Sequence, residues 1–296
     1  EFRRVLFRSQ LMDSLHDFTS AYTKWEVEQS KKPKPEKPLP PMSDKEVDVK
    51  GNLIFPTFKC AHTHSPRILL KSLTDLKIAE GASINAEAYL NDDYIYWLTK
   101  YAILEYLKNG IGVIADMYNS LDAIMAASNE SGIRNSLSHM INNDFVKGKD
   151  IIHIYENGFD VYKKDLCDYR VGIHSEGAAD IVLLKEISAY VNANKKPIRV
   201  HLSEKEEEIA KCKEKYGKTQ VELFRDLGLF NYGGTVIHMV HPNEKDIQIL
   251  SDMNVNVVTC PGANANVGAG ICPVKELIDK GINVGVGLGA PSANLS

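Results

Sequence analysis

Short apolar runs alternate with longer amphipathic stretches from residue 46 to the end of the chain. Eight runs are rich in β-branched or other apolar residues: residues 53–62, 110–117, 133–140, 169–175, 198–204, 234–240, 254–260 and 282–289. Helical spacing is seen between most of them, for example over residues 92–109, 179–194 and 218–229. This alternation is typical of βα units that build a parallel sheet.

Eight strands is the number that closes a (β/α)8 barrel, and a chain of 296 residues can hold the roughly 250 residues that such a barrel needs. We therefore predict an α/β fold with a (β/α)8 TIM-type barrel over residues 46–296. The third run, IRNSLSHM, is polar for a buried strand. An open, doubly wound sheet therefore stays an alternative.

The sequence before the barrel has a different character. Residues 10–30 carry apolar side chains at helical spacing, and KKPKPEKPLPPM then holds five of the twelve prolines. We predict a helical insert and a stiff linker over residues 10–45, because such a proline-rich stretch is extended and cannot join a core. The first nine residues, EFRRVLFRS, resemble an in-frame translation of a sequencing adapter, and we interpret residues 1–9 as an artefact.

Charge and cysteine content narrow the class of protein. The formal net charge is −4, with 35 basic and 39 acidic residues well mixed, which argues against nucleic acid or an anionic membrane as partner. We expect a small-molecule substrate. The five cysteines form no CxxC pair and are odd in number, which favours free thiols and a cytoplasmic location. No apolar run approaches the roughly 18 residues of a membrane span.

Histidines stand where the predicted strands end. His62 and His64 close the first run as HTH, and a strand would place them on one face about 7 Å apart. Further polar residues end later runs: Asp116, His174, His201 and His238. Chemistry in such barrels is built at the carboxyl ends of the strands, so this placement favours a shared metal ion over hydrogen-bonded core histidines.

Glu204 follows His201 by three residues, so a carboxylate and a metal ligand would share one rim. That position suits a general acid/base, although SEKEEE is also a good first turn of a helix. The spacing HxxH links His238 to His241, but GTVIHMV predicts a strand, on which only His238 faces the barrel mouth. His241 is then structural or solvent-exposed. His174 is a candidate hydrogen-bond donor to substrate.

Three histidines, His16, His139 and His153, lack any supporting context and are interpreted as structural. GVGLGA at residues 285–290 also fits the loose GxGxxG/A dinucleotide fingerprint. That pattern requires a following helix and an acidic residue about 20 positions later, which this chain does not extend far enough to supply.

Several segments together resemble a known superfamily. GNLIFPTFKCAHTHSP resembles the entry segment of the amidohydrolase superfamily. VGIHS, VHLSE, VIHMVHP and VTCPGANANVGAGICPVKEL resemble, in order and spacing, the later strands of its adenosine-type and guanine deaminase branch, with S-adenosylhomocysteine and methylthioadenosine deaminases and related chlorohydrolases. The likeness covers about residues 46–290.

The resemblance implies a distorted (β/α)8 barrel with one divalent metal, zinc in the first place and iron or nickel as alternatives. It implies His62, His64 and His201 as metal ligands, Glu204 as proton shuttle, His238 as the group that orients water or substrate, and His174 as a substrate contact. No lysine ends the fourth run, so no second metal is expected. The implied activity is hydrolysis of a non-peptide C–N bond, with deamination of a purine-like or other heterocyclic amine.

One departure opens an alternative function. The family expects a GTDG turn after strand eight, whereas this chain has GLGAPSANLS, with Leu288 or Gly289 at the aspartate position and no Asp or Glu after Asp279. A catalytically silent paralogue with a binding or regulatory role is therefore the second hypothesis. The family's small β domain and final helix also lack counterparts, so we expect a barrel truncated at both ends, with KEVDVKGN as a remnant of the β domain. A homo-oligomer stays open.

Overall fold

The computed structural model describes residues 48–72, 87 and 89–290. The chain divides into two compact units, Glu1–Ile54 and Phe55–Ser296. The predicted artefact at residues 1–9 and the predicted insert and linker at 10–45 belong to the first unit and lie outside the described residues. The second unit holds all the strands and helices described below.

Parallel strands form the centre of the second unit, and every neighbouring pair is parallel. They are arranged as two sheets, β1-β2-β3-β4 and β5-β6-β7-β8-β9. The strands are β1 (Phe58–Thr63), β2 (Ile111–Asp116), β3 (Arg134–Leu137), β4 (Cys167–Tyr169), β5 (Val171–Ser175), β6 (Ile198–Leu202), β7 (Gly234–His238), β8 (Val255–Thr259) and β9 (Val284–Val286).

The two sheets join into one barrel. Only Arg170 separates β4 from β5, so the fourth predicted run is a single barrel strand that pairs with β3 through its first half and with β6 through its second. The chain after β9 bonds to β1, because His64 donates its backbone N–H to Gly289 and Leu288 donates to His62. A parallel bridge joins Thr63 to Gly289. The prediction of an eight-stranded α/β barrel is confirmed.

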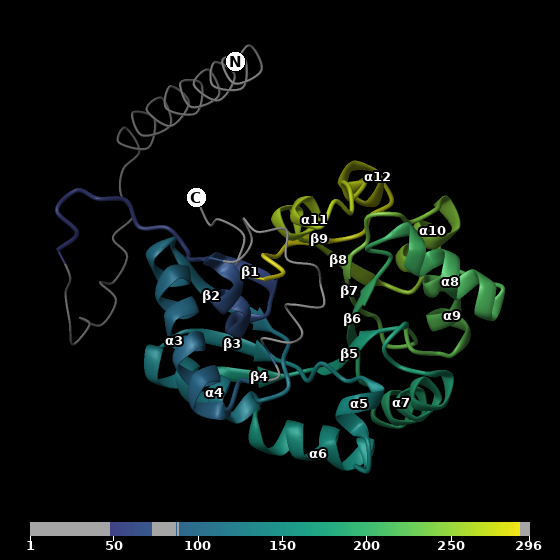
Figure 1. Ribbon diagram of the computed structural model, residues 1–296. Coiled ribbons are helices and arrows are strands. Elements are labelled where there is room, and N and C mark those ends of the chain that lie inside the picture. Colours follow the sequence, from purple (N-terminus) through teal and green to yellow (C-terminus); the bar gives the residue numbers. More distant parts are fainter. Residues whose placement is uncertain (1–47, 73–86, 88, 291–296) are drawn as a thin grey trace, which may run out of the picture. The chain divides into compact units, whose positions relative to one another are not determined.

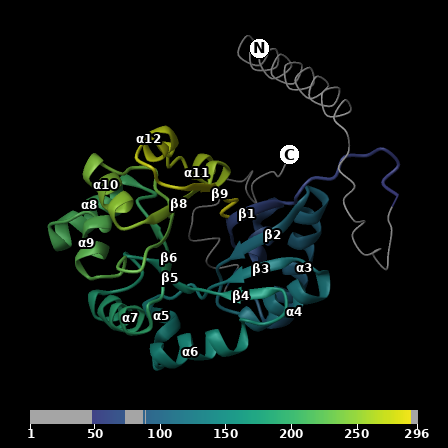
Figure 2. The same cartoon turned by 180° about the vertical axis from the view of Figure 1, so that it is seen from behind.

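Helices lie on the outside of the strands, as Figures 1 and 2 show from opposite sides. They are η1 (Ser65–Ser72), α3 (Asp92–Lys108), α4 (Leu121–Ser131), α5 (Asn143–Val146), α6 (Ile151–Val161), α7 (Ile181–Asn194), α8 (Glu206–Tyr216), α9 (Gln220–Asp226), α10 (Glu244–Asp252), α11 (Pro261–Asn266) and α12 (Val274–Asp279). The three helical segments predicted over residues 92–109, 179–194 and 218–229 are confirmed. None of the described helices is long and apolar enough to cross a membrane.

Burial explains why the strands read as apolar runs. All five residues of β6 are buried, and Val200 shares one core cluster with Leu184 and Ile187 of α7. Side chains that alternate along a barrel strand face either the helices or the barrel interior, and on β6 the side chains of both faces are buried. The five cysteines are also buried and free, which confirms the prediction of unpaired thiols.

Several predicted strand boundaries differ from the structure, and those of β1 and β7 bear on the site. The first strand begins at Phe58, rather than at Leu53, and Pro56 lies just before it, where a residue without an N–H cannot support a sheet ladder. β7 ends at His238, where φ is +75°, and Met239 follows at +48°. His241 therefore lies in a loop beyond the strand, where its Nε2 is 2.7 Å from the backbone oxygen of Ala269. This contact favours the structural alternative of the two that were predicted for His241.

The glycine-rich segment after residue 284 closes the barrel against β1. A Cβ on Gly287 would lie 2.8 Å from the backbone oxygen of His62, and one on Gly285 would lie 3.1 Å from Cβ of Ala61. The glycines allow this close approach of β9 to β1. The structure thus gives the glycines of the GVGLGA segment a packing role.

The buried His139 should make the protein's stability depend on pH. Its Nδ1 is 2.7 Å from the hydroxyl of Tyr169, and burial, with a smaller effect of Lys149, lowers its pKa to about 4. A lowered folded-state pKa stabilises the fold above the unfolded value near 6.5, and this contribution is lost as the pH falls toward 4. When the pH falls from about 6.5 to 4, the free energy of unfolding of the wild type should drop. In His139→Gln this drop should be smaller by about 3 kcal/mol, because the buried imidazole is gone.

Urea denaturation at pH 7 and pH 4.5 measures this difference. The exposed His153→Gln provides the matched control. Equal pH slopes for the His139 and His153 variants would contradict the assignment.

Candidate metal centre

Three histidines from opposite sides of the barrel meet in its interior. His62 and His64 project from the end of β1 with their Nε2 atoms 3.2 Å apart, as the alternation of a strand requires. His201, from β6, places its Nε2 3.0 Å from that of His62. The ligand atoms of all three lie within 4.8 Å of one another. The structure thus brings the predicted ligand set together.

Backbone carbonyls fix two of these rings from behind. Nδ1 of His64 lies 2.6 Å from the oxygen of Met117, and Nδ1 of His201 lies 2.7 Å from the oxygen of His174. Because a carbonyl only accepts, each Nδ1 carries the proton, and each neutral ring presents an Nε2 lone pair to the centre. Metal-binding histidines are usually oriented by such bonds.

The donor set fits a cation. His62 can give a single proton from its Nε2, so it cannot satisfy both lone pairs that approach it at 3.2 and 3.0 Å. Its buried Nδ1 has no hydrogen-bond partner within the described structure. Tetrahedral zinc with Zn–N bonds of about 2.0–2.1 Å would separate its ligands by about 3.3 Å. A divalent metal between the rings therefore removes the conflict.

The three rings are held in the form that binds metals. Burial lowers the pKa of His62, His64 and His201 well below the usual range. Electrostatic repulsion from neighbouring groups lowers each pKa further. For His62 and His201 the main neighbour is His64, and for His64 it is Arg67. The neutral imidazole with a free lone pair is thus favoured over the protonated ring.

His238 lies next to the triad and faces Glu204. Glu204 is two residues beyond β6, and its carboxylate Oε2 is 3.8 Å from Nε2 of His238. The His238 ring stacks on that of His201, with centroids 5.4 Å apart. Nδ1 of His238 lies 2.7 Å from the amide oxygen of Asn264 in α11, which directs Nε2 toward the carboxylate. A carboxylate and an imidazole are therefore available beside the triad.

His174 is also close to the centre, at the end of β5. Its ring centroid lies 5.5 Å from that of His201, and its buried Nδ1 has no hydrogen-bond partner among the described residues. Burial, with a smaller effect of Arg67, lowers the pKa of His174 to about 4. The ring is thus neutral at physiological pH and can still donate one hydrogen bond from a ring nitrogen.

Asp116 occupies a different place from the histidines, although it too ends a strand. It is buried, and its Oδ1 accepts the backbone N–H of Ser65, the residue after His64. Its register partner is Thr63, the strand residue between the two histidines. Burial raises the pKa of Asp116 to about 6. Asp116 thus fastens the HTHS segment and is not part of the triad.

Sequence reasoning missed the groups that orient the rings. The oxygens of Met117 and His174 are backbone atoms, which no residue type reveals. Asn264 could have drawn attention, since it follows the seventh predicted run within the short PGANAN segment. Within the described part of the chain, the metal-binding group contains no carboxylate from the turn after β9, in agreement with the sequence.

Comparisons with known proteins place this geometry in context. The chain is 31% identical over 277 residues to 5-methylthioadenosine/S-adenosylhomocysteine deaminase of Thermococcus sibiricus. This match covers 90% of this chain and 65% of the relative. It is 30% identical over 265 residues to 5'-deoxyadenosine deaminase of Methanosarcina acetivorans, with 85% and 60% covered. The chain thus spans less than two thirds of the length of these relatives.

The fold is similar to that of a solved adenosine deaminase from Xanthomonas campestris with bound zinc. The TM-score is 0.72 at 21% identity, and the match covers 81% of this chain and 57% of that one. Residues 53–294, which include every histidine of the centre, match the Amidohydrolase family. The chain therefore belongs to the Amidohydrolase family.

Proposed function

We propose that this protein is a metal-dependent hydrolase that releases the amino group of a purine-like or other heterocyclic amine as ammonia. The observation that carries the proposal is the convergence of three neutral imidazoles beside a facing pair of carboxylate and imidazole. The deaminase names of the relatives support the same activity.

His62, His64 and His201 would hold one divalent cation, with zinc as the first choice because a neighbour of the same fold was solved with zinc. Iron and nickel also accept imidazole ligands. When bound, such a metal acts as a Lewis acid and favours ionisation of water near neutral pH. No lysine ends the fourth strand, where Ser175 closes β5, so one metal is expected.

Glu204 acts as the proton shuttle in this scheme. Its carboxylate takes a proton from the attacking water and gives it to the leaving amino group, which departs as ammonia. Its side chain is 22% exposed, so solvent can exchange the proton between turnovers. His238 acts opposite Glu204: its Nε2 orients the water or the substrate, while Asn264 restrains its other nitrogen.

His174 contacts the substrate in this scheme. Its neutral ring donates to a ring nitrogen or exocyclic oxygen of a heterocycle, since its Nδ1 is buried without a protein partner in the described structure. The substrate is a small molecule, and the cytoplasm is the proposed location, which suits the free thiols.

A catalytically silent paralogue is the weaker of the two hypotheses. It is motivated by the turn after β9, where Leu288 and Gly289 stand in place of an aspartate. The relatives reported above are named as enzymes, which gives this hypothesis no support. Three imidazoles can hold zinc without a carboxylate, as in other three-histidine sites.

Metal content tests the centre directly. We expect about one zinc per chain after dialysis against zinc and then against buffer, and near zero for His201→Ala, because two imidazoles hold zinc far more weakly than three. Elemental analysis by mass spectrometry makes the measurement. The exposed His153→Ala is the control, and equal zinc in both variants would refute the ligand set.

Ammonia release tests the reaction. We expect Glu204→Gln to lose about 10²–10⁴-fold in kcat with zinc retained, because an amide cannot carry the proton. Adenosine, guanine and methylthioadenosine form the substrate panel. The nearby exposed Glu207→Gln should turn over like the wild type. Unchanged turnover in Glu204→Gln would remove the shuttle role.

A further inference from the structure

Ser203 forms the turn between the predicted metal ligand His201 and Glu204. Its φ is +54°, in the left-handed region that residues with a Cβ seldom adopt. Its backbone oxygen accepts N–H groups from Val240 at 2.9 Å and His241 at 3.2 Å. The turn after β6 is thereby joined to the turn after β7, which follows His238.

The N–H of Ser203 is bound by a side chain from another element. Gln220, at the start of α9, accepts it through Oε1 at 2.7 Å. The other end of the same amide, Nε2, donates to Oε2 of Glu176 at 3.5 Å. Gln220 is 1% exposed and Glu176 is 6% exposed. One buried amide therefore links the loop after β5 to the loop after β6.

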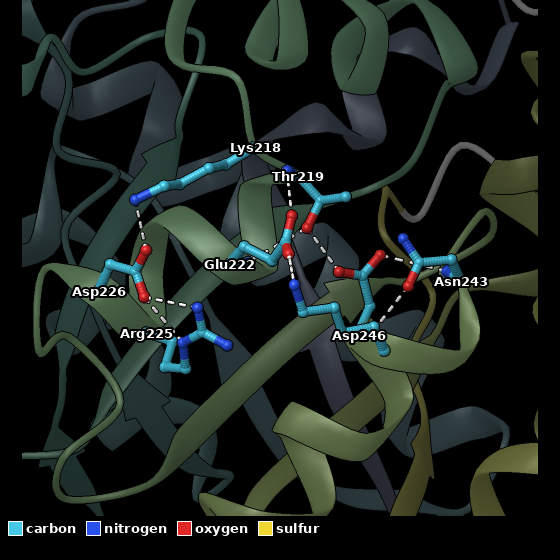
Figure 3. Close-up of polar contacts among 8 residues, drawn as sticks. Lys218, Thr219, Glu222, Arg225, Asp226, Asn243 and Asp246 are labelled. Carbon is cyan, nitrogen blue, oxygen red and sulfur yellow. Dashed lines mark hydrogen bonds and ion pairs between the residues drawn. The ribbon is translucent and has the colours of Figure 1, made fainter.

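Hydrogen bonds and ion pairs join α9, the helix that begins with Gln220, to α10, and Figure 3 shows the residues that make them. Thr219 caps α9 in a capping box with Glu222, and its hydroxyl donates to Asp246 of α10 at 2.5 Å. Glu222 also pairs with Lys245 at 2.5 Å. The backbone that carries Gln220 is thus tied to a second helix, while the amide itself is held by Ser203 and Glu176.

We propose that Gln220 is a positioning residue that stabilises the Ser203 turn and so aims the Glu204 carboxylate at His238. The proposal rests on the shuttle role of Glu204 in the proposed function. A strained backbone conformation persists only when its surroundings hold it, and the contact with Gln220 supplies this at the N–H. Without it, a buried donor is left unpaired and the turn relaxes.

The metal ligands do not depend on this contact. His201 lies within β6, in register with Ile237 of β7, and its Nδ1 is fixed by His174. Loss of the Gln220 amide therefore acts on the residues after the strand, Ser203 and Glu204. This separates the positioning role from a general loss of the centre.

The test replaces Gln220 with methionine, which has a similar shape and no hydrogen-bonding amide. We expect amide hydrogen exchange at Ser203 to become at least about tenfold faster, kcat for ammonia release to fall about 10–100-fold, and KM and zinc content to change less than about twofold. Gln248→Met, at an exposed position on α10, is the matched control with wild-type values.

Two further variants separate positioning from mere packing. In the Glu204→Gln background, Gln220→Met should cause no further fall in kcat, since the carboxylate to be aimed is gone. The double variant Glu176→Gln with Gln220→Glu swaps the two buried side chains. It restores an acceptor for the N–H of Ser203 and reverses the donor and acceptor between positions 176 and 220, so kcat should recover to within about threefold of wild type.

Three results would overturn the proposal: unchanged exchange at Ser203, an equal fall in the Glu204→Gln background, or a loss of zinc that accounts for the lost turnover. A zinc-loaded wild type that releases no ammonia from the panel would instead defeat the proposed function. The exchange rate at Ser203 still decides whether Gln220 holds the turn in that case.

Discussion

The hydrogen bonds that close the barrel between β1 and the chain after β9 determine where everything else lies. His62 lies on β1 and His64 directly follows it, while His201 lies on β6, and the triad spans the interior between them. A sheet left open at Gly289 would have no reason to bring those strands within reach of each other. The closing contacts include the backbone of His62 and His64 themselves, so fold and centre share the same bonds.

Around that closure, the chain orients polar groups mainly with backbone atoms. Carbonyl oxygens of Met117 and His174 set the ring protons of two histidines, and the turn after β7 binds the backbone oxygen of Ser203. Side-chain amides then finish the arrangement at Asn264 and Gln220. This arrangement directs the imidazole lone pairs of His64 and His201 toward His62, and the Glu204 carboxylate lies 3.8 Å from Nε2 of His238.

The sequence predicted the barrel and the convergence of the histidines, because β-branched runs mark buried strands and parallel strands end at one rim. It placed the first strand boundary wrongly at Leu53 and extended the sixth predicted strand, β7, past His238. It missed Asn264 and Gln220, since their partners lie far away in the chain and depend on how helices dock. The roles of Glu204, His238 and His174 agree with their placement and stay predictions.

Gly287 shows how a defect in one part of the chain would be felt in another. With no side chain, it lies against His62, where even a methyl group would sit 2.8 Å from the backbone oxygen and 3.0 Å from Cβ. An alanine at position 287 would push β1 away from the chain after β9, where the barrel closes. A substitution that changes only backbone packing would then displace His62 and weaken metal binding.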